Sequence, residues 1–341
     1  SAVDSRYSEH QREQFDDGWE EDIEQIGRQQ RTQVSFESPK TIISHNQSPD
    51  VPFEQSINAY RGCEHGCIYC FARPTHAYLD LSPGLDFETK LTAKRNAAAL
   101  LKKQLLAKNY HCKPIALGAN TDPYQPIERL YHITRDILLV LQQLNHPCTI
   151  TTKSALVERD LDIIAAMAKK NLIHVNISIT TLDHELSRKL EPRASSPKRR
   201  LQTIKTLLQA HIPTHLLLAP VIPVLTDSEM ESILQAASDA GAQSADYILL
   251  RLPREVSELF IEWLHHHYPD KAQHVINQIR DTRQGRNNDA SFEHRGSGQG
   301  AIADMINQRF KLASQKHQLN NALPELDTEL FRPHPTQIDL F

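Results

Sequence analysis

RGCEHGCIYCFARP, at residues 61–74, is the most informative stretch of this chain. It places Cys63, Cys67 and Cys70 in one short loop with the spacing Cys-x3-Cys-x2-Cys. Three thiolates can bind three irons of a 4Fe–4S cube and leave the fourth iron without a protein ligand. A fourth protein ligand would close the site, whereas an open coordination position lets a bound molecule react. The spacing therefore predicts one cluster with an open iron.

A zinc site with His65 as fourth ligand is the alternative interpretation of this loop. Structural zinc sites usually pair two ligands with two more that lie far along the chain. The remaining cysteines, Cys112 and Cys148, are isolated and form no second pair. Five cysteines, an odd number, also argue against a disulfide framework. We therefore favour the cluster, and we expect only one.

Composition and length place the chain among ordinary globular proteins. Its 341 residues suffice for one domain of barrel size or two smaller ones. No apolar run is long enough to span a bilayer and no signal peptide is visible, so we expect no membrane contact and a cytoplasmic, reducing location. The net charge of −4 gives no global basic footprint for nucleic acid, although it leaves room for a local patch.

Strands and helices alternate from about residue 56 onward. The predicted strands are Ser56–Arg61, Pro114–Gly118, Cys148–Thr152, Ile173–Thr180, His215–Val221 and Tyr247–Leu252. The predicted helices between them are Ala93–Lys108, Leu130–Leu144, Leu161–Lys170, Pro197–Ala210 and Asp227–Ala240. This order predicts right-handed βαβ units around a parallel sheet, an α/β fold of the partial (β/α)6 TIM barrel type. The cysteine loop follows the first strand, at the end of the barrel where such folds carry their sites.

Four regions follow from this pattern. Residues 1–50 are polar and rich in glutamine and acidic side chains, and we expect a flexible extension. Residues 51–254 form the predicted barrel. Residues 255–330 have the pattern of helices with a glycine-rich break, and we expect them to form a C-terminal helical cap over the barrel mouth. Residues 331–341 read as a flexible tail.

Further motifs recur at the ends of the predicted strands. In chain order they are Thr121-Asp122, Thr151-Thr152-Lys153, Ser178, the run Glu191-Pro192-x-x-Ser195-Ser196, and Ala219-Pro220-Val221-Ile222. Together with the cysteine loop and Tyr69 before its third cysteine, this series resembles the spore photoproduct lyase branch of the radical S-adenosylmethionine (radical SAM) enzymes. It is similar to a bacterial group labelled DNA repair photolyase. The resemblance spans residues 56–331.

The resemblance implies a chemistry and a set of contacts. In that family the open iron chelates S-adenosylmethionine, one electron cleaves it to methionine and a 5′-deoxyadenosyl radical, and the radical abstracts hydrogen from the substrate. The electron would come from a donor such as flavodoxin or ferredoxin. By the resemblance, the residues that contact S-adenosylmethionine are Tyr69, Asn120, Lys153, Ser178 and Ala219.

One position departs from the lyase pattern. The lyase uses a cysteine just before the Thr/Ser-Asp step as hydrogen donor to the product radical, and this chain has Ala119 there. Tyr124 is the nearest phenol in the sequence, so we expect it to donate hydrogen instead.

Two features of the sequence point to DNA. The predicted cap carries Arg280, Arg283, Arg286 and Arg295 among amide side chains, a composition that suits phosphate contacts. The last residues, Gln337, Ile338, Asp339, Leu340 and Phe341, resemble the pentapeptide that binds the bacterial sliding clamp. Glutamine would anchor by hydrogen bonds, and the Leu-Phe pair would fill an apolar pocket.

The sequence therefore predicts a radical SAM enzyme that acts on damaged or modified DNA. Radical modification of RNA, a peptide or a small metabolite remains an alternative. A non-catalytic module that carries a cluster or zinc is a second one.

Overall fold

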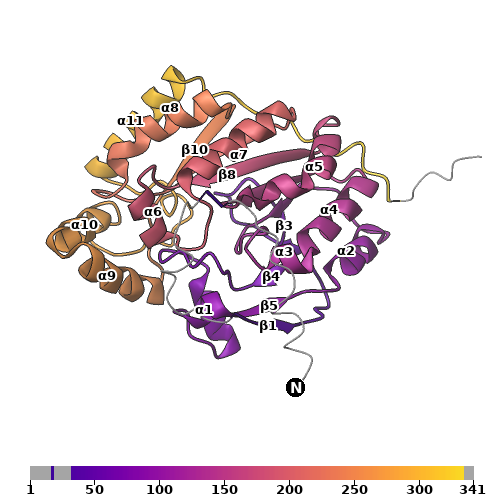
Figure 1. Cartoon of the computed structure of the whole chain (residues 1–341), viewed down its shortest axis with the longest axis horizontal. Coiled ribbons are helices and arrows are strands. Elements are labelled where there is room, and N and C mark those ends of the chain that lie inside the picture. Colours follow the sequence, from indigo (N-terminus) through magenta and orange to yellow (C-terminus); the bar gives the residue numbers. More distant parts are fainter. Residues whose placement is uncertain (1–16, 19–31, 334–341) are drawn as a thin grey trace, which may run out of the picture.

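The computed structural model of this chain describes residues 17–18 and 32–333, and its centre is a seven-stranded sheet (Figure 1). The strand order is β10-β9-β8-β7-β6-β3-β2, and every pair from β3 to β10 is parallel. The strands are β2 Ser44–His45, β3 Gln55–Ile57, β6 Ile115–Leu117, β7 Cys148–Thr152, β8 Ile173–Ile179, β9 Thr214–Val221 and β10 Ser244–Leu249. The prediction of a partial parallel barrel is confirmed.

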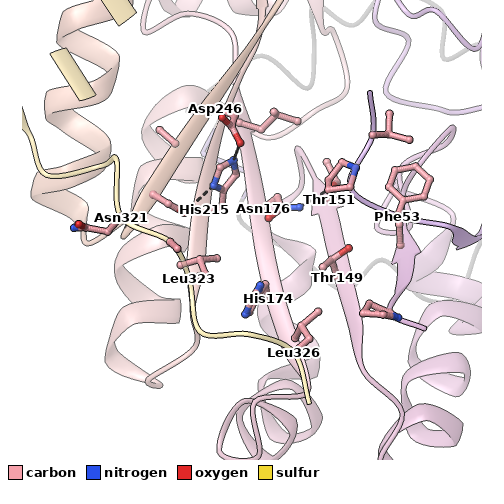
Figure 2. Close-up of a pocket in the computed structure, with 18 of the residues that line it drawn as sticks. Phe53, Thr149, Thr151, His174, Asn176, His215, Asp246, Asn321, Leu323 and Leu326 are labelled. Atoms are coloured by element: carbon pink, nitrogen blue, oxygen red, sulfur yellow. Dashed lines mark hydrogen bonds and ion pairs between the residues drawn. The ribbon is translucent and has the colours of Figure 1, made fainter. Parts of the chain in front are cut away.

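Alternation along the strands separates a helix-covered face from the barrel interior. In β8, Ile173, Val175 and Ile177 are buried in the main apolar core. The residues between them, His174 and Asn176, line the space inside the barrel (Figure 2). Successive side chains of a strand point to opposite faces, so the barrel interior is polar while the outer face is apolar.

Helices cover the outer face of the sheet. They are α2 Ala97–Leu105, α3 Glu128–Tyr131, α4 Ile133–Gln143, α5 Leu161–Ala168, α7 Pro197–Gln209, α8 Met230–Ala240 and α11 Ala301–Lys316. α6 (His184–Leu190) instead packs in the apolar cluster that includes the cysteine loop. α2 packs on α4, α4 on α5, α7 on α8 and α8 on α11, which gives the curved outer wall of Figure 1. None of the helices in the described residues combines the length and apolarity needed to cross a membrane.

The segment before the barrel is more ordered than the sequence predicted. Residues 33–36 form β1, which pairs in parallel with β5 (Lys90–Ala93), and β5 also pairs with β4 (Tyr60–Arg61). Ile42 and Ile43 are buried, and both of their backbone N–H groups donate to the Gln104 side chain. The expectation of a flexible extension up to residue 50 is therefore wrong for residues 32–50.

The C-terminal region divides into two parts. α9 (Glu255–His267) and α10 (Pro269–Asp281) pack on each other, and their apolar cluster includes Cys67 and Tyr69 of the cysteine loop. α11 instead covers β10 and completes the outer wall. The predicted cap thus corresponds to α9 and α10, which form a separate group in Figure 1.

The start of the predicted tail packs on the barrel. The backbone N–H of Arg332 donates to the carbonyl of Leu144, and the Phe331 ring lies against Tyr110 and His146. Residues 331–333 are therefore not a free tail. The clamp-binding motif at 337–341 lies outside the described residues.

Candidate functional site

A pocket of about 210 Å³ lies at the C-terminal ends of the barrel strands. The loop after β4 brings three thiols to it, and the ends of β6 to β10 supply the other walls. Every residue that the sequence predicted for metal or cofactor binding lines this one pocket: Cys63, Cys67, Cys70, Tyr69, Asn120, Lys153, Ser178 and Ala219. The fold therefore gathers residues that lie up to 156 positions apart in the sequence, from Cys63 to Ala219.

Arg73 holds the cysteine loop in shape. Its guanidinium, only 1% exposed, donates to the carbonyls of Cys67 and Gly66 at 2.8 and 2.9 Å. It also pairs with Glu88 at 2.6 Å, which neutralises the buried charge. No signal in the sequence identifies this role, because arginine is rarely buried and its partners are backbone atoms. Arg73 therefore fixes the thiols without lining the pocket.

Gly66 is required for the turn between the first two cysteines. Its φ is +68°, a region that side chains rarely adopt, and an added Cβ would meet Arg193 and Glu88 at 2.6 Å. The same arginine and glutamate form an ion pair across this turn. A side chain at residue 66 would therefore strain the backbone and displace the ends of these two side chains.

The thiols have the chemistry that a cluster needs. All three are free cysteines, and burial raises the pKa of each, that of Cys67 to about 12. Among the described residues, no three His, Cys, Asp or Glu side chains converge as ligands of a single ion would. A cube places each thiolate on a different iron, so three separated thiols around one pocket fit it. Binding must release their protons, since the ligand is the thiolate.

Asp122 connects the cysteine loop to the ends of two strands. Its side chain is 9% exposed, and it accepts hydrogen bonds from the Thr152 hydroxyl and the Lys153 backbone at 2.7 Å. His65 Nδ1 lies 3.3 Å from it. Although burial raises the pKa of Asp122, His65 and these donors lower it more, so the carboxylate is ionised. His65 therefore has an aspartate as its partner in this structure rather than the thiols.

A buried ion network forms the floor of the pocket. Glu191 is fully buried and contacts Arg200, Lys153 and the Tyr69 hydroxyl. Burial raises its pKa, but Arg200 and Lys153 lower it further, so the net pKa lies well below the usual range. The sequence contains Glu191 as the first residue of a motif, yet only the structure identifies it as the central member of this network.

The ammonium of Lys153 makes several contacts within this network. Its ammonium contacts Ser178 Oγ at 2.7 Å, the Ala219 carbonyl at 3.0 Å and Glu191 Oε1 at 3.1 Å. Three donors meet three acceptors, so a ligand could contact this ammonium only by taking the place of one of them. Three of the residues predicted to contact the cofactor, Lys153, Ser178 and Ala219, are thus bonded to one another.

Tyr124 does not line the pocket, in contrast to its predicted role as hydrogen donor. Its side chain is 0% exposed, and its hydroxyl donates to Asp160 at 3.0 Å. Asp160 also pairs with Arg135 and Arg159 behind β7. A phenol enclosed in this network cannot reach a molecule in the pocket, so we assign Tyr124 to the core and withdraw its catalytic role.

A second cavity of about 1350 Å³ occupies the barrel interior (Figure 2). Side chains from β7, β8 and β9 point into it, and the segment around Leu323 and Leu326 runs across its lower end. The two cavities share four lining residues, Ala119, Thr151, Leu217 and Ile248. The cysteine pocket therefore adjoins the polar barrel interior directly.

Two histidines stand among the apolar and polar side chains that line this second cavity. His215 contacts Ser244 Oγ at 2.8 Å and Asp246 at 3.6 Å (Figure 2). The buried Nε2 atom of His174 has no hydrogen-bond partner among the described residues. Burial lowers the pKa of both histidines, so their rings are neutral near pH 7 and can each donate and accept. Such a wall suits a polar, uncharged group.

Three of the four arginines that the sequence predicts as DNA contacts have partners within the chain. Arg283 is 1% exposed and donates to the carbonyls of Leu249 and Leu250, so it cannot bind an external phosphate. Arg280 donates to Asn287 at 2.9 Å, and Arg295 pairs with Asp50. Arg286 alone of these four is exposed without a side-chain hydrogen bond in the described part of the chain. The prediction fails for Arg283 because burial of an arginine cannot be read from composition.

Comparisons with known proteins agree with this geometry. Residues 57–237, more than half of the chain, match the family model described as the radical SAM superfamily. An uncharacterised protein of Mycobacterium tuberculosis, Rv2578c, is 39% identical over 222 residues, which cover 64% of this chain and 65% of that protein. Another, MJ0683 of Methanocaldococcus jannaschii, is 29% identical over 65% of this chain and 79% of its own length. The chain thus spans about two thirds of the length of the mycobacterial relative.

Solved structures of spore photoproduct lyase share the fold. The lyase complexed with dinucleoside spore photoproduct matches with a TM-score of 0.59 at 15% identity, over 83% of this chain and 79% of that one. A lyase variant with bound AdoMet and the same dinucleoside matches with a TM-score of 0.54 at 15% identity, over 83% and 78% of the two chains. At this identity the likeness concerns the arrangement of the barrel alone.

Proposed function

This chain belongs to the radical SAM superfamily, and from this premise we propose that it abstracts hydrogen from damaged or modified DNA. The observation that carries the proposal is the junction of the two cavities at Ala119, Thr151, Leu217 and Ile248. A molecule in the barrel interior would there meet a cofactor in the cysteine pocket. Reacting groups must be held within contact distance of each other, and this junction would let molecules in the two cavities touch.

The residues of the small pocket fit the cofactors of the family. Cys63, Cys67 and Cys70 would hold a 4Fe–4S cluster, and Tyr69 and Asn120 border the space beside it. When bound, the cluster and S-adenosylmethionine supply a 5′-deoxyadenosyl radical that removes a hydrogen atom from the substrate. The chain itself supplies a pocket whose floor is fixed by Lys153 and Glu191.

Two observations support DNA as the substrate class. The lyase that shares this barrel has been solved with a dinucleoside photoproduct in place. The larger cavity here is lined by apolar and polar side chains, and among them His174 and His215 can donate and accept hydrogen bonds as a nucleobase edge requires. A base that enters this cavity must leave the duplex stack, which damaged or single-stranded DNA permits at lower cost.

Isotope transfer tests the proposed substrate. The reconstituted protein would be incubated anaerobically with S-adenosylmethionine, a reductant and deuterated oligonucleotides that carry candidate lesions. We expect deuterium in the 5′-deoxyadenosine product with DNA, and none with deuterated RNA, peptide or metabolite pools. Transfer from one of those other pools, and none from DNA, would replace the proposed substrate. Absence of 5′-deoxyadenosine altogether would favour a non-catalytic module.

Replacing Lys153 with alanine is expected to weaken S-adenosylmethionine binding while the iron content stays the same. The change removes the cation of the pocket floor and releases Ser178 and the Ala219 carbonyl. One charge-assisted hydrogen bond is worth roughly 1.5–3 kcal/mol, so the dissociation constant should rise by about tenfold or more. Equilibrium dialysis with labelled cofactor measures it. Lys94→Ala is the control, because Lys94 donates to the Asn58 carbonyl outside the pocket. An equal dissociation constant in the two variants would remove Lys153 from the cofactor site.

Deleting Gln337–Phe341 is expected to remove binding to the bacterial sliding clamp and to leave cofactor cleavage intact. Leu340 and Phe341 would each bury an apolar side chain, worth roughly 1.5–3 kcal/mol before the tail is ordered. We therefore expect micromolar affinity for a labelled peptide of the last residues titrated with purified clamp. Equal binding by a peptide with Leu340→Ala and Phe341→Ala would contradict the motif.

A further inference from the structure

Arg251 occupies an unusual position at the cysteine pocket. It lies two residues after the end of β10, lines the same pocket as the thiols, and is partly buried. Its guanidinium lies over the ring of Phe71, 4.9 Å from the ring centroid. Phe71 comes immediately after Cys70 in the cysteine loop. The stack therefore places a cation next to the thiols, at the mouth of the pocket.

The charge of Arg251 is not matched by a partner. In the part of the chain that the structure describes, its guanidinium makes no hydrogen bond and no ion pair. The nearest acidic group, Asp50, already receives hydrogen bonds on both carboxylate oxygens from Arg295. Burial, followed by the charge of Arg295, lowers the pKa of Arg251, and Asp50 only partly opposes this. Partly buried charges are normally paired, so an anion is missing from this position.

Two more arginines beside the mouth of the cysteine pocket also contact aromatic side chains. Arg254, three residues further on, is exposed and donates to the hydroxyl of Tyr78 at 3.3 Å. Arg295 lies over the Phe292 ring at 5.0 Å. Arg251 and Arg295 thus lie over aromatic rings, and Arg254 contacts a tyrosine hydroxyl. The side chains they contact, Phe71, Tyr78 and Phe292, are 44%, 75% and 48% exposed. Cations combined with exposed rings are the features that bind a single nucleic-acid strand.

We propose that Arg251 binds a backbone phosphate of the nucleic-acid substrate at the mouth of the cysteine pocket, with Phe71 as the platform that orients it. Stacking on a ring leaves the edge of the guanidinium, with its N–H donors, free for a bidentate contact with a phosphate. The phosphate would then be fixed outside while the attached nucleotide reaches inward. This inference rests on the proposed function, and it replaces the cap arginines as the main phosphate contact.

Binding measurements on the reconstituted holoprotein test this role without turnover. Anisotropy of a short fluorescein-labelled single-stranded DNA is followed at several salt concentrations for Arg251→Gln. We expect binding weaker by about tenfold or more, the loss of one charge-assisted contact. The slope of log affinity against log salt should decrease in magnitude by about 0.7, the value for one phosphate of a single strand. The dissociation constant for S-adenosylmethionine should not change.

Arg95→Gln is the matched control. Arg95 also lies over an exposed phenylalanine, Phe36, at 3.5 Å from the ring centroid. Phe36 belongs to β1, in the sheet formed by β1, β5 and β4, and neither residue lines one of the two cavities. Arg95→Gln should leave the affinity for DNA and its salt slope as in the wild type. An equal loss in the two variants would mean that Arg251 acts only through the general charge of the surface, and would overturn the proposal.

Two other outcomes would also overturn it. If Arg251→Gln weakens S-adenosylmethionine binding and leaves DNA binding unchanged, the missing anion is the cofactor's carboxylate. If neither affinity changes, the position binds no anion. Thermal-shift measurements with pyrophosphate distinguish a failure of this inference from a failure of the proposed function. Stabilisation of the wild type that is lost in Arg251→Gln would support the phosphate site, even if no oligonucleotide serves as substrate.

Discussion

Replacing Cys67 with alanine is expected to remove nearly all of the bound iron and sulfide from anaerobically reconstituted protein. Two thiolates remain, and two ligands cannot hold a cube that normally has three or four. The wild type should contain about four irons and four sulfides per chain, in the stoichiometry of one cluster. Chemical analysis of iron and acid-labile sulfide, with the visible absorbance of the cluster, measures the effect.

Cys148 provides the matched control for this experiment. It is also buried, at 0% exposure against 8% for Cys67, but it lies at the start of β7 at the opposite end of the strand from the pocket. Cys148→Ala should retain the full cluster, with at most a loss of stability from the small cavity that it leaves. An intact cluster in Cys67→Ala, or loss of the cluster in Cys148→Ala, would show that the iron is held elsewhere.

Replacing Glu191 with alanine is expected to destabilise the folded protein more than any other single change in the ion pairs described here. The change leaves Arg200, which is 1% exposed, and Lys153 without their carboxylate. Breaking a buried ion pair by removal of one partner typically costs about 3–5 kcal/mol, because the remaining charge is buried and uncompensated. The free energy of unfolding of the reduced apoprotein in urea measures the loss. Cofactor binding should fall as well, since Glu191 fixes Lys153 and Tyr69.

An exposed pair of the same chemistry is the control. Glu231 pairs with Arg309 through two hydrogen bonds of 2.8 Å, but these side chains are 44% and 29% exposed. Glu231→Ala should cost at most about 1 kcal/mol, the usual range for a surface salt bridge. If Glu191→Ala costs no more than Glu231→Ala, the floor of the pocket is not held by its charges, and the interpretation of this network is wrong.

Local patterns in the sequence predicted the barrel and the cysteine pocket. β7 and β8 are rich in β-branched residues, and their observed ends match the prediction within a residue. The cysteine spacing is equally local, so it identified the loop without the structure. β10 begins at Ser244 and not at Tyr247, because its first residues, Ser244 and Ala245, carry no strand signal. β10 also ends at Leu249. Arg251, which the sequence predicts within the strand, therefore lies after it and lines the pocket.

Features that depend on long-range contacts could not be predicted. β1 is a strand because it pairs with β5, about 57 residues away in the chain, and nothing near Gln33 indicates this. Arg73, Arg200 and Arg283 are buried by partners distant in sequence or by backbone carbonyls, although arginine normally favours the surface. The sequence predicts Tyr124 as the hydrogen donor because it is the phenol nearest to Ala119. Its side chain points instead into the core, where Asp160 binds it.

Formation of 5′-deoxyadenosine is the most direct test of the assignment made here. Reconstituted wild-type protein is incubated anaerobically with S-adenosylmethionine and a strong reductant, and 5′-deoxyadenosine and methionine are measured by liquid chromatography. We predict that both products form in equal amounts and that neither forms in Cys67→Ala. Protein that holds a complete cluster, binds S-adenosylmethionine and still yields no 5′-deoxyadenosine would contradict the assignment.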